Sequence, residues 1–241
     1  MALHCMMGSA AYWGAIAKRL DGRVDLMGFD MPGHGRSSSW TPRPDGPDFH
    51  TAVTRVAASF IERPLDLIGH SLGATVALRI AVAAPDAVRS LTLIEPVLFA
   101  AAPDAEQEAR DKVMSEHMIH GRTSDAARGF IDIWGAQPFD TLPPSAQRAM
   151  TNQIGLVIDT DETLAKDRAN ILREGGLESI DAPVLIVAGE RSPTVIHRIA
   201  DALAARFADV GRAVVPNAGH MLPLTHPDQT ADLIGLNLDR A

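Results

Sequence analysis

A serine between two glycines is the feature of this chain that points most directly to chemistry. Ser71 stands in the stretch Gly-His-Ser-Leu-Gly at residues 69–73, after a short apolar run and before a small-residue helical pattern. Gly-x-Ser-x-Gly in that setting predicts a sharp strand-to-helix turn that lifts the serine hydroxyl above a sheet, because only glycine lacks the Cβ that would collide there. We interpret Ser71 as a candidate nucleophile; the alternative is a Gly/Ser-rich turn ahead of a buried helix.

A serine hydroxyl becomes an effective nucleophile only when a base takes its proton, so an imidazole is needed. Among nine histidines, His220 is favoured because it lies in a glycine turn, Asn-Ala-Gly-His, just past a strand-like run. His117 and His120 are three residues apart on an expected helix, but no cluster of carboxylates or thiolates accompanies them. We therefore predict no metal site and no cofactor.

Four motifs in a fixed order connect this chain to a known group of proteins. An apolar strand end leads into His-Cys-Met-Met-Gly at 4–8, and a second such run leads into Asp-Met-Pro-Gly-His-Gly-Arg-Ser at 30–37. The Ser71 turn and the His220 turn follow. In this order the chain resembles the α/β-hydrolase superfamily, specifically its small capped members, over essentially its whole length. The resemblance implies a mostly parallel central sheet with flanking helices and a helical cap inserted after the sixth family strand.

The acid that would orient His220 is where the chain departs from its relatives. The family usually has aspartate in a Gly-x-x-Asp pattern after the strand at 184–188, but here the pattern ends in Ser192. Glu95 ends the strand that follows the nucleophile's helix, the position at which haloalkane dehalogenases of this superfamily carry their acid. A carboxylate at the end of a buried apolar run also needs a partner. We predict Glu95 as the acid; Glu190, or no carboxylate at all, are the alternatives.

Two backbone amides are expected to bind the negative charge that develops on a substrate oxygen. One is that of Leu72, at the N-terminus of the helix after Ser71, where the helix dipole reinforces it. The resemblance implies that the other is that of Met6. Cys5, beside it, is interpreted as a small buried residue rather than a nucleophile. The expected walls of the substrate pocket are Met7, Trp40, Leu98, Phe99, Trp134, Phe139 and Met221.

The elements that must position these residues alternate as βαβ units do. We predict strands at 2–5, 24–30, 65–69, 91–95, 184–189 and 212–216, and helices at 11–20, 50–61, 72–84, 193–208 and 227–240. Only amphipathic helices are expected between them, at 104–120, 124–134, 144–158 and 161–174. The predicted domains are a core of 1–97 and 177–241 and a cap of 98–176. Family members usually begin with two more strands, so the sheet is expected to lack them unless the chain is trimmed.

The composition of the chain indicates which kinds of binding partner to expect. The chain has 241 residues and a net charge of −8, without runs of Lys or Arg, which argues against nucleic acid or an anionic membrane surface as partner. No apolar stretch approaches the length of a membrane span. A single cysteine rules out an intrachain disulfide and suits a reducing cytoplasm. We expect a cytoplasmic monomer or homodimer whose partner is a small-molecule substrate.

These observations favour hydrolysis of a small, mostly apolar carboxylic ester through an acyl intermediate on Ser71, with water completing the cycle. Lactone, thioester and carbon–carbon bond hydrolysis stay open, because they use the same groups. A cofactor-free haloperoxidase-like activity is a further alternative. An alternative from a different functional class is a catalytically silent ligand-binding or scaffold protein. The missing aspartate at position 192 favours this hypothesis.

Overall fold

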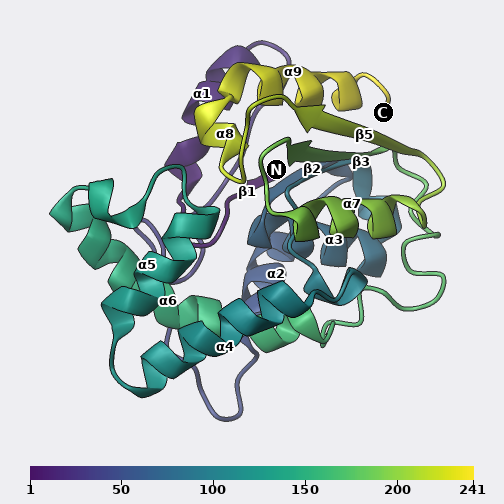
Figure 1. Cartoon of the computed structure of the whole chain (residues 1–241). Coiled ribbons are helices and arrows are strands. Elements are labelled where there is room, and N and C mark those ends of the chain that lie inside the picture. The colour runs from purple at the N-terminus through teal and green to yellow at the C-terminus, as the bar shows by residue number, and fades with distance from the viewer.

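The computed structural model describes all 241 residues and has a five-stranded, fully parallel sheet at its centre (Figure 1). The strands lie in chain order: β1 (Ala2–Leu3), β2 (Leu65–His70), β3 (Val88–Ile94), β4 (Val184–Gly189) and β5 (Val210–Val215). Because every strand runs the same way, their carboxyl ends meet at one edge, where ligands bind in open parallel sheets. The predicted fold class, a parallel sheet with flanking helices, is confirmed.

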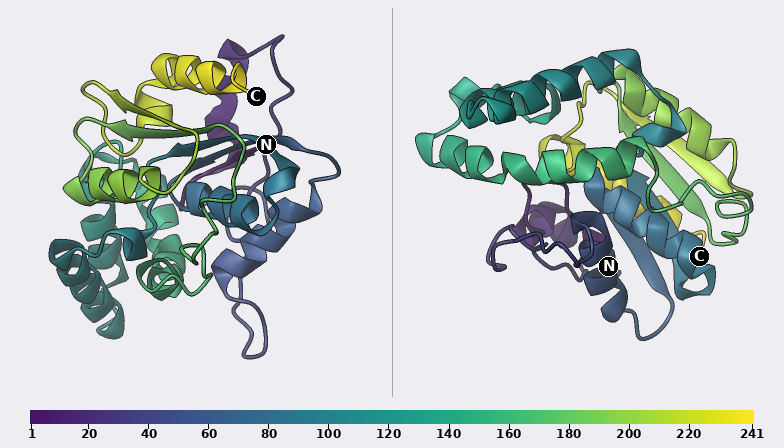
Figure 2. Two further views of the ribbon diagram at one scale, coloured as in Figure 1. Left: turned by 90° about the vertical axis from the view of Figure 1, so that its right-hand side faces the viewer. Right: turned by 90° about the horizontal axis from the view of Figure 1, so that it is seen from below.

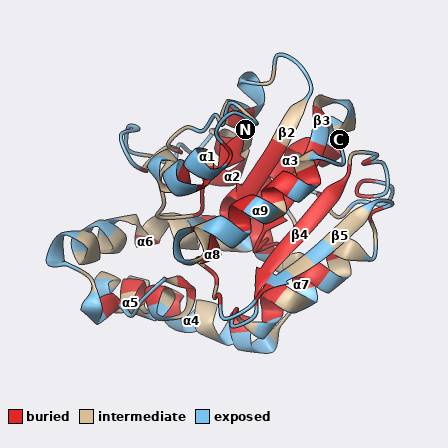
Figure 3. Cartoon of the chain, turned by 90° about the horizontal axis from the view of Figure 1, so that it is seen from above, coloured by how far each residue is buried: buried red, intermediate tan, exposed pale blue.

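Helices cover both faces of the sheet, as the successive views in Figure 2 show. One face packs against α2 (Phe49–Ser59), α3 (Leu72–Ala83) and α7 (Thr194–Ala204), and the other against α1 (Gly14–Arg19), α8 (Leu222–Thr225) and α9 (Pro227–Leu238). Alternate strand residues separate the two cores: Leu93 packs with α3, and its neighbour Ile94 with α1 and α9. Strand β4 is buried from end to end, and β3 is buried at every position except Arg89 (Figure 3).

Three helices are inserted between β3 and β4, and they lie together beyond the carboxyl edge of the sheet (Figure 1). They are α4 (Ala105–Ile119), α5 (Thr123–Trp134) and α6 (Pro144–Ala165). These helices have a small core of their own, to which Met114, Ile131 and Ile154 contribute. We refer to α4, α5 and α6 as the inserted helices; they lie within the predicted cap of 98–176.

Two element predictions were wrong. Residues 24–30 form no strand: the segment runs beside β1, but Ala2 makes the one backbone bond, its N–H donating to Met27 O at 2.7 Å. Just beyond, the N–H of Met31 donates to the imidazole of His4 and not to a backbone carbonyl. The regular backbone bonds of a parallel strand pair are therefore missing here.

The predicted helix at 161–174 does not exist as a separate element. Helix α6 continues through position 161 and ends at Ala165. Irregular turns follow, because the carboxylate of Asp167 accepts hydrogen bonds from the N–H groups of Ile171 and Leu172, at 2.8 and 2.7 Å. A side chain that binds nearby backbone amides competes with helix continuation. Asp161, expected at a helix start, therefore lies inside α6.

No helix of the structure combines the length and the apolar composition that crossing a membrane requires.

Candidate active site

Ser71 lies at the carboxyl end of β2, immediately before α3, on a backbone that turns sharply. Its φ of 56° and ψ of −118° are rare for a residue with a side chain and indicate local strain. The two flanking glycines make this turn possible. A Cβ on Gly69 would lie 2.3 Å from the carbonyl oxygen of Gly73, and a Cβ on Gly73 would lie 2.3 Å from that of Leu3. The predicted tight turn is therefore present, and glycine is required on both sides of it.

His220 reaches Ser71 from the loop that follows β5. Its Nε2 lies 3.0 Å from the Oγ of Ser71, and both side chains are buried. His70 holds this loop in place: its Nε2 lies 2.9 Å from the backbone carbonyl oxygen of His220. The indole of Trp134 on α5 packs edge-on against the His220 ring, with ring centroids 4.8 Å apart. The imidazole is thus fixed in position and shielded from bulk water.

Glu95 lies on the other side of His220. Its Oε2 is 2.8 Å from Nδ1 of His220, so Nδ1 carries a proton toward the carboxylate and Nε2 is free to accept the Ser71 proton. The side chain is fully buried, and its second oxygen accepts bonds from the Gly189 N–H at 2.6 Å and the Ser192 hydroxyl at 2.7 Å. Glu95 has a φ of 53°, which turns its side chain back under the histidine. Three donors thus satisfy a carboxylate that would be costly to bury alone.

The other candidates for the acid do not contact the His220 ring. Glu190 is exposed, and its Oε2 accepts from the N–H of Asn217, so it supports the turn before His220 without touching the ring. Ser192 does occupy the neighbourhood where the family pattern has aspartate, but it serves as a hydrogen-bond donor to Glu95. The scaffold hypothesis was based on the missing aspartate, and the carboxylate of Glu95 removes that argument.

The two amides expected to bind an oxyanion are both unused. Neither the N–H of Met6 nor that of Leu72 donates a hydrogen bond within the protein. Both residues line the cavity beside Ser71. Free N–H groups at the start of a helix are suited to an anionic oxygen.

Two histidines hold the Met6 loop in place. His4 Nε2 accepts the N–H of Met31 at 3.0 Å, so its Nδ1 donates to the carbonyl of Cys5 at 2.7 Å. His34 Nε2 accepts the N–H of Met7 at 2.9 Å, one residue beyond the expected oxyanion amide. Burial lowers the pKa of His4 to about 4, which keeps it neutral and able to accept. Burial raises the pKa of the Cys5 thiol to about 12, so this cysteine is not a nucleophile.

Two cavities meet at Ser71. The smaller, of about 60 Å³, extends under α4 and α6; the larger, of about 200 Å³, extends beside α5 and is mostly apolar. Among the predicted wall residues, Phe99 lines the smaller cavity, Met7 and Met221 the larger one, and Trp134 both.

Three predicted wall residues line neither cavity. Leu98 is 1% exposed and packs in the main core, and Phe139 is equally buried in the core of the inserted helices, under Arg128. Trp40 packs edge-on against Phe49 of α2. The sequence shows that these three side chains are large and apolar, but such a side chain fills a core as readily as it lines a pocket.

Sequence reasoning missed a polar group in the smaller cavity. Asp111 of α4 and Asp161 of α6 line it within hydrogen-bonding reach of each other, and Gln107 lies beside them. Gln107 Nε2 donates to Asp111 Oδ1 at 2.8 Å. Four acidic residues are spread along α4, and nothing in their spacing distinguishes an inward one from those that face water.

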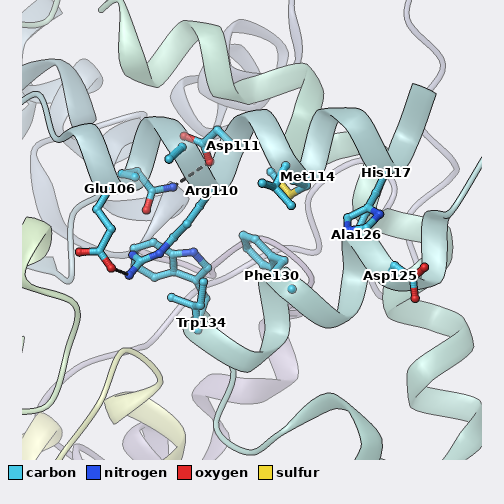
Figure 4. Close-up of a pocket in the computed structure, with 14 residues that line it drawn as sticks. Glu106, Arg110, Asp111, Met114, His117, Asp125, Ala126, Phe130 and Trp134 are labelled. Atoms are coloured by element: carbon cyan, nitrogen blue, oxygen red, sulfur yellow. Dashed lines mark hydrogen bonds and ion pairs between the residues drawn. The ribbon is translucent and has the colours of Figure 1, made fainter. Parts of the chain in front are cut away.

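A third hollow, of about 420 Å³, lies on the outer side between α4 and α5 (Figure 4). The side chains that line it and are labelled in the figure include Glu106, Arg110, His117, Asp125, Phe130 and Trp134. It shares five lining residues with the smaller cavity, and these form the wall between the two: Gln107, Asp111, Met114, Phe130 and Trp134.

Comparison with known proteins identifies the family of this chain. The family model described as "Alpha/beta hydrolase family" matches residues 2–233. A pimeloyl-[acyl-carrier protein] methyl ester esterase of Neisseria meningitidis serogroup A is 28% identical over 238 residues, covering 92% of this chain and 72% of that protein. A 2-(acetamidomethylene)succinate hydrolase of Mesorhizobium japonicum is 25% identical over 245 residues, covering 96% of this chain and 84% of that protein.

Solved structures share the fold. An alpha/beta hydrolase from a deep-sea metagenome library of the Medee basin superposes with a TM-score of 0.77 at 18% identity, covering 100% of this chain and 88% of the other. The haloalkane dehalogenase DatA of Agrobacterium tumefaciens superposes with a TM-score of 0.76 at 19% identity, covering 100% of this chain and 89% of the other.

Proposed function

Because this chain belongs to the alpha/beta hydrolase family, we propose that it is a serine hydrolase that cleaves a small, mostly apolar carboxylic ester. The observation that carries the proposal is the buried line Ser71–His220–Glu95, with contacts of 3.0 and 2.8 Å. The names of the relatives, an ester hydrolase among them, support the reaction class. The larger apolar cavity beside Ser71 supports an apolar substrate.

In the first half of the reaction, Nε2 of His220 takes the proton of Ser71 as Oγ attacks the ester carbonyl carbon. The carbonyl oxygen becomes anionic and accepts the free N–H groups of Met6 and Leu72. The imidazolium that forms is stabilised by the carboxylate of Glu95. His220 then returns the proton to the leaving alcohol, and the acyl group stays on Ser71.

In the second half, a water molecule gives a proton to Nε2 of His220 and attacks the acyl carbon. The same amides bind the second oxyanion, and collapse restores the Ser71 hydroxyl with the proton from His220 while the carboxylic acid is released. Ser71 as nucleophile also separates this chemistry from that of dehalogenases and epoxide hydrolases, which form an ester on a carboxylate.

A panel of p-nitrophenyl esters of increasing acyl length tests this function. The native protein is expected to release p-nitrophenol with a preference for short acyl groups, and Ser71→Ala is expected to reduce kcat by about three orders of magnitude or more. Native protein that hydrolyses no member of the panel, or Ser71→Ala protein that keeps native activity, would contradict the proposal.

A further inference from the structure

The inner end of the smaller cavity contains acceptors and almost no donors. Asp111, Asp161 and Gln107 line it, and neither a lysine nor an arginine does. The amide nitrogen of Gln107 is engaged by Asp111, while its Oε1 has no hydrogen-bond partner although the residue is 95% buried. Oε1 belongs to the same amide group as that nitrogen, and Gln107 lines the smaller cavity and also the outer hollow. An acceptor left unpaired at this depth is costly and calls for a donor.

We infer that this group is a subsite for a primary ammonium group carried on the acyl part of the substrate. An ammonium has three N–H donors and no acceptor, and the subsite offers three acceptor groups: the Gln107 amide oxygen and the Asp111 and Asp161 carboxyls. Met6 and Leu72, whose amides would hold the carbonyl oxygen of the acyl group, line the same cavity. The inference rests on the proposed function and adds a substrate class to it.

The size of the cavity limits the length of the acyl group. A volume of about 60 Å³ holds roughly four water-sized groups. The ammonium would therefore be carried only a few atoms from the ester carbonyl. An anionic group at the same place would face two carboxyls. The cation that acts on Asp111, Arg110, lines the outer hollow instead of this cavity and is paired with Glu106. Carboxylate-bearing acyl groups are therefore expected to be excluded.

The titration of the pair fits a site that would bind a cation. Burial, and next the neighbouring Asp161 carboxylate, raise the pKa of Asp111 to about 7, against the opposing effects of Gln107 and Arg110. Burial and the Glu162 carboxylate raise the pKa of Asp161. Near neutral pH the two carboxyls therefore share a proton. A bound ammonium would favour the doubly ionised pair, so binding is expected to release a proton.

A matched substrate series tests the subsite. The three methyl esters are those of 3-aminopropanoic acid, which carries the ammonium, of butanoic acid, its apolar counterpart, and of succinic acid as the anionic monoester. Native protein is expected to favour the ammonium ester over methyl butanoate in kcat/KM by about tenfold or more and to act least on the anionic ester. Asp111→Asn and Asp161→Asn are expected to abolish the preference while still hydrolysing methyl butanoate.

Asparagine keeps the link between α4 and α6, because its amide can still bond the remaining aspartate and Gln107. A purely structural role for the pair therefore predicts unchanged selectivity in these variants. Glu108→Gln is the matched control: it removes a carboxyl from the exposed side of α4, away from the cavities, and should keep native selectivity. Native protein that shows no preference, or Asp111→Asn protein that retains it, would overturn the inference.

A binding measurement separates this inference from the proposed function. Calorimetric titration with n-butylammonium, in two buffers of different ionisation heat, reports affinity and proton release without turnover. If the protein binds butylammonium in an Asp111-dependent manner but hydrolyses no ester, the subsite is supported and the proposed esterase function is refuted. Hydrolysis that depends on Ser71, without butylammonium binding or ester preference, would retain the esterase and refute the subsite; a protein with neither property refutes both.

Discussion

Ser192 donates a hydrogen bond to Glu95, its Oγ lying 2.7 Å from Oε1 of the carboxylate. His220 uses the other oxygen of the same group, at 2.8 Å. The serine that stands where relatives have an aspartate therefore still belongs to the hydrogen-bond network of the site. It donates to the glutamate that contacts the histidine.

Glu95→Gln tests the role of this carboxylate. The amide has nearly the shape of the carboxylate but cannot stabilise an imidazolium, so kcat for ester hydrolysis is expected to fall by about two to four orders of magnitude. Glu190→Gln is the control, because Glu190 is exposed and contacts the Asn217 amide rather than the ring. The measurement is kcat of both variants by steady-state kinetics. Equal kcat values would show that Glu95 does not take part in the mechanism.

Ser192→Ala removes one of three donors to the buried carboxylate. A hydrogen bond to a charged group contributes about 1.5–3 kcal/mol, so the free energy of unfolding should decrease by that order. Urea unfolding measures this, and kcat should fall less than in Glu95→Gln, because the His220 contact remains. A variant as stable as the native protein would show that this bond does not hold Glu95.

Gly73→Ala tests the turn at Ser71. The added Cβ would lie 2.3 Å from a backbone oxygen of β1, which no rotamer change can relieve, so a loss of about 3 kcal/mol of unfolding free energy is expected. Gly219→Ala, next to His220, is the matched control, since a Cβ there meets nothing within 4 Å. Thermal melts should separate the two variants; equal melting temperatures would contradict the described turn.

Asp111→Asn should change how stability depends on pH. The folded-state pKa of Asp111 is about 7 against an ordinary 3.8, so the folded protein binds a proton that the unfolded chain has lost. This carboxyl therefore destabilises the fold increasingly as pH rises from about 4 to 7, and asparagine does not. The variant should gain stability relative to native protein at pH 8 compared with pH 5, by urea unfolding at each pH. A constant difference would contradict the shift.

The core of the site was predictable because its residues follow strand signals. Ser71 and His220 stand in glycine turns after apolar runs, and a parallel sheet brings such turns to one edge. Glu95 could be predicted from its place at the end of β3 and from the absence of an acid at position 192. The local backbone that turns Glu95 under the histidine, with its φ of 53°, had no sequence signal.

The walls of the site were less predictable, because they depend on how the inserted helices pack on one another. Trp134 was predicted as a wall residue and lines both cavities, but Phe139, five residues later, is in a core. Asp111 and Asp161 meet only because α6 extends further than its sequence pattern predicted. Side-chain type alone does not show which face of such a helix is turned inward.

The central claim is that Ser71 is activated by His220 and attacks the substrate. Labelling with a fluorophosphonate, followed by intact-mass measurement and peptide mapping, tests it most directly. We predict one adduct per chain, located on Ser71, absent from Ser71→Ala and formed far more slowly in His220→Ala. An unlabelled native protein, or an adduct on any other residue, would contradict the account.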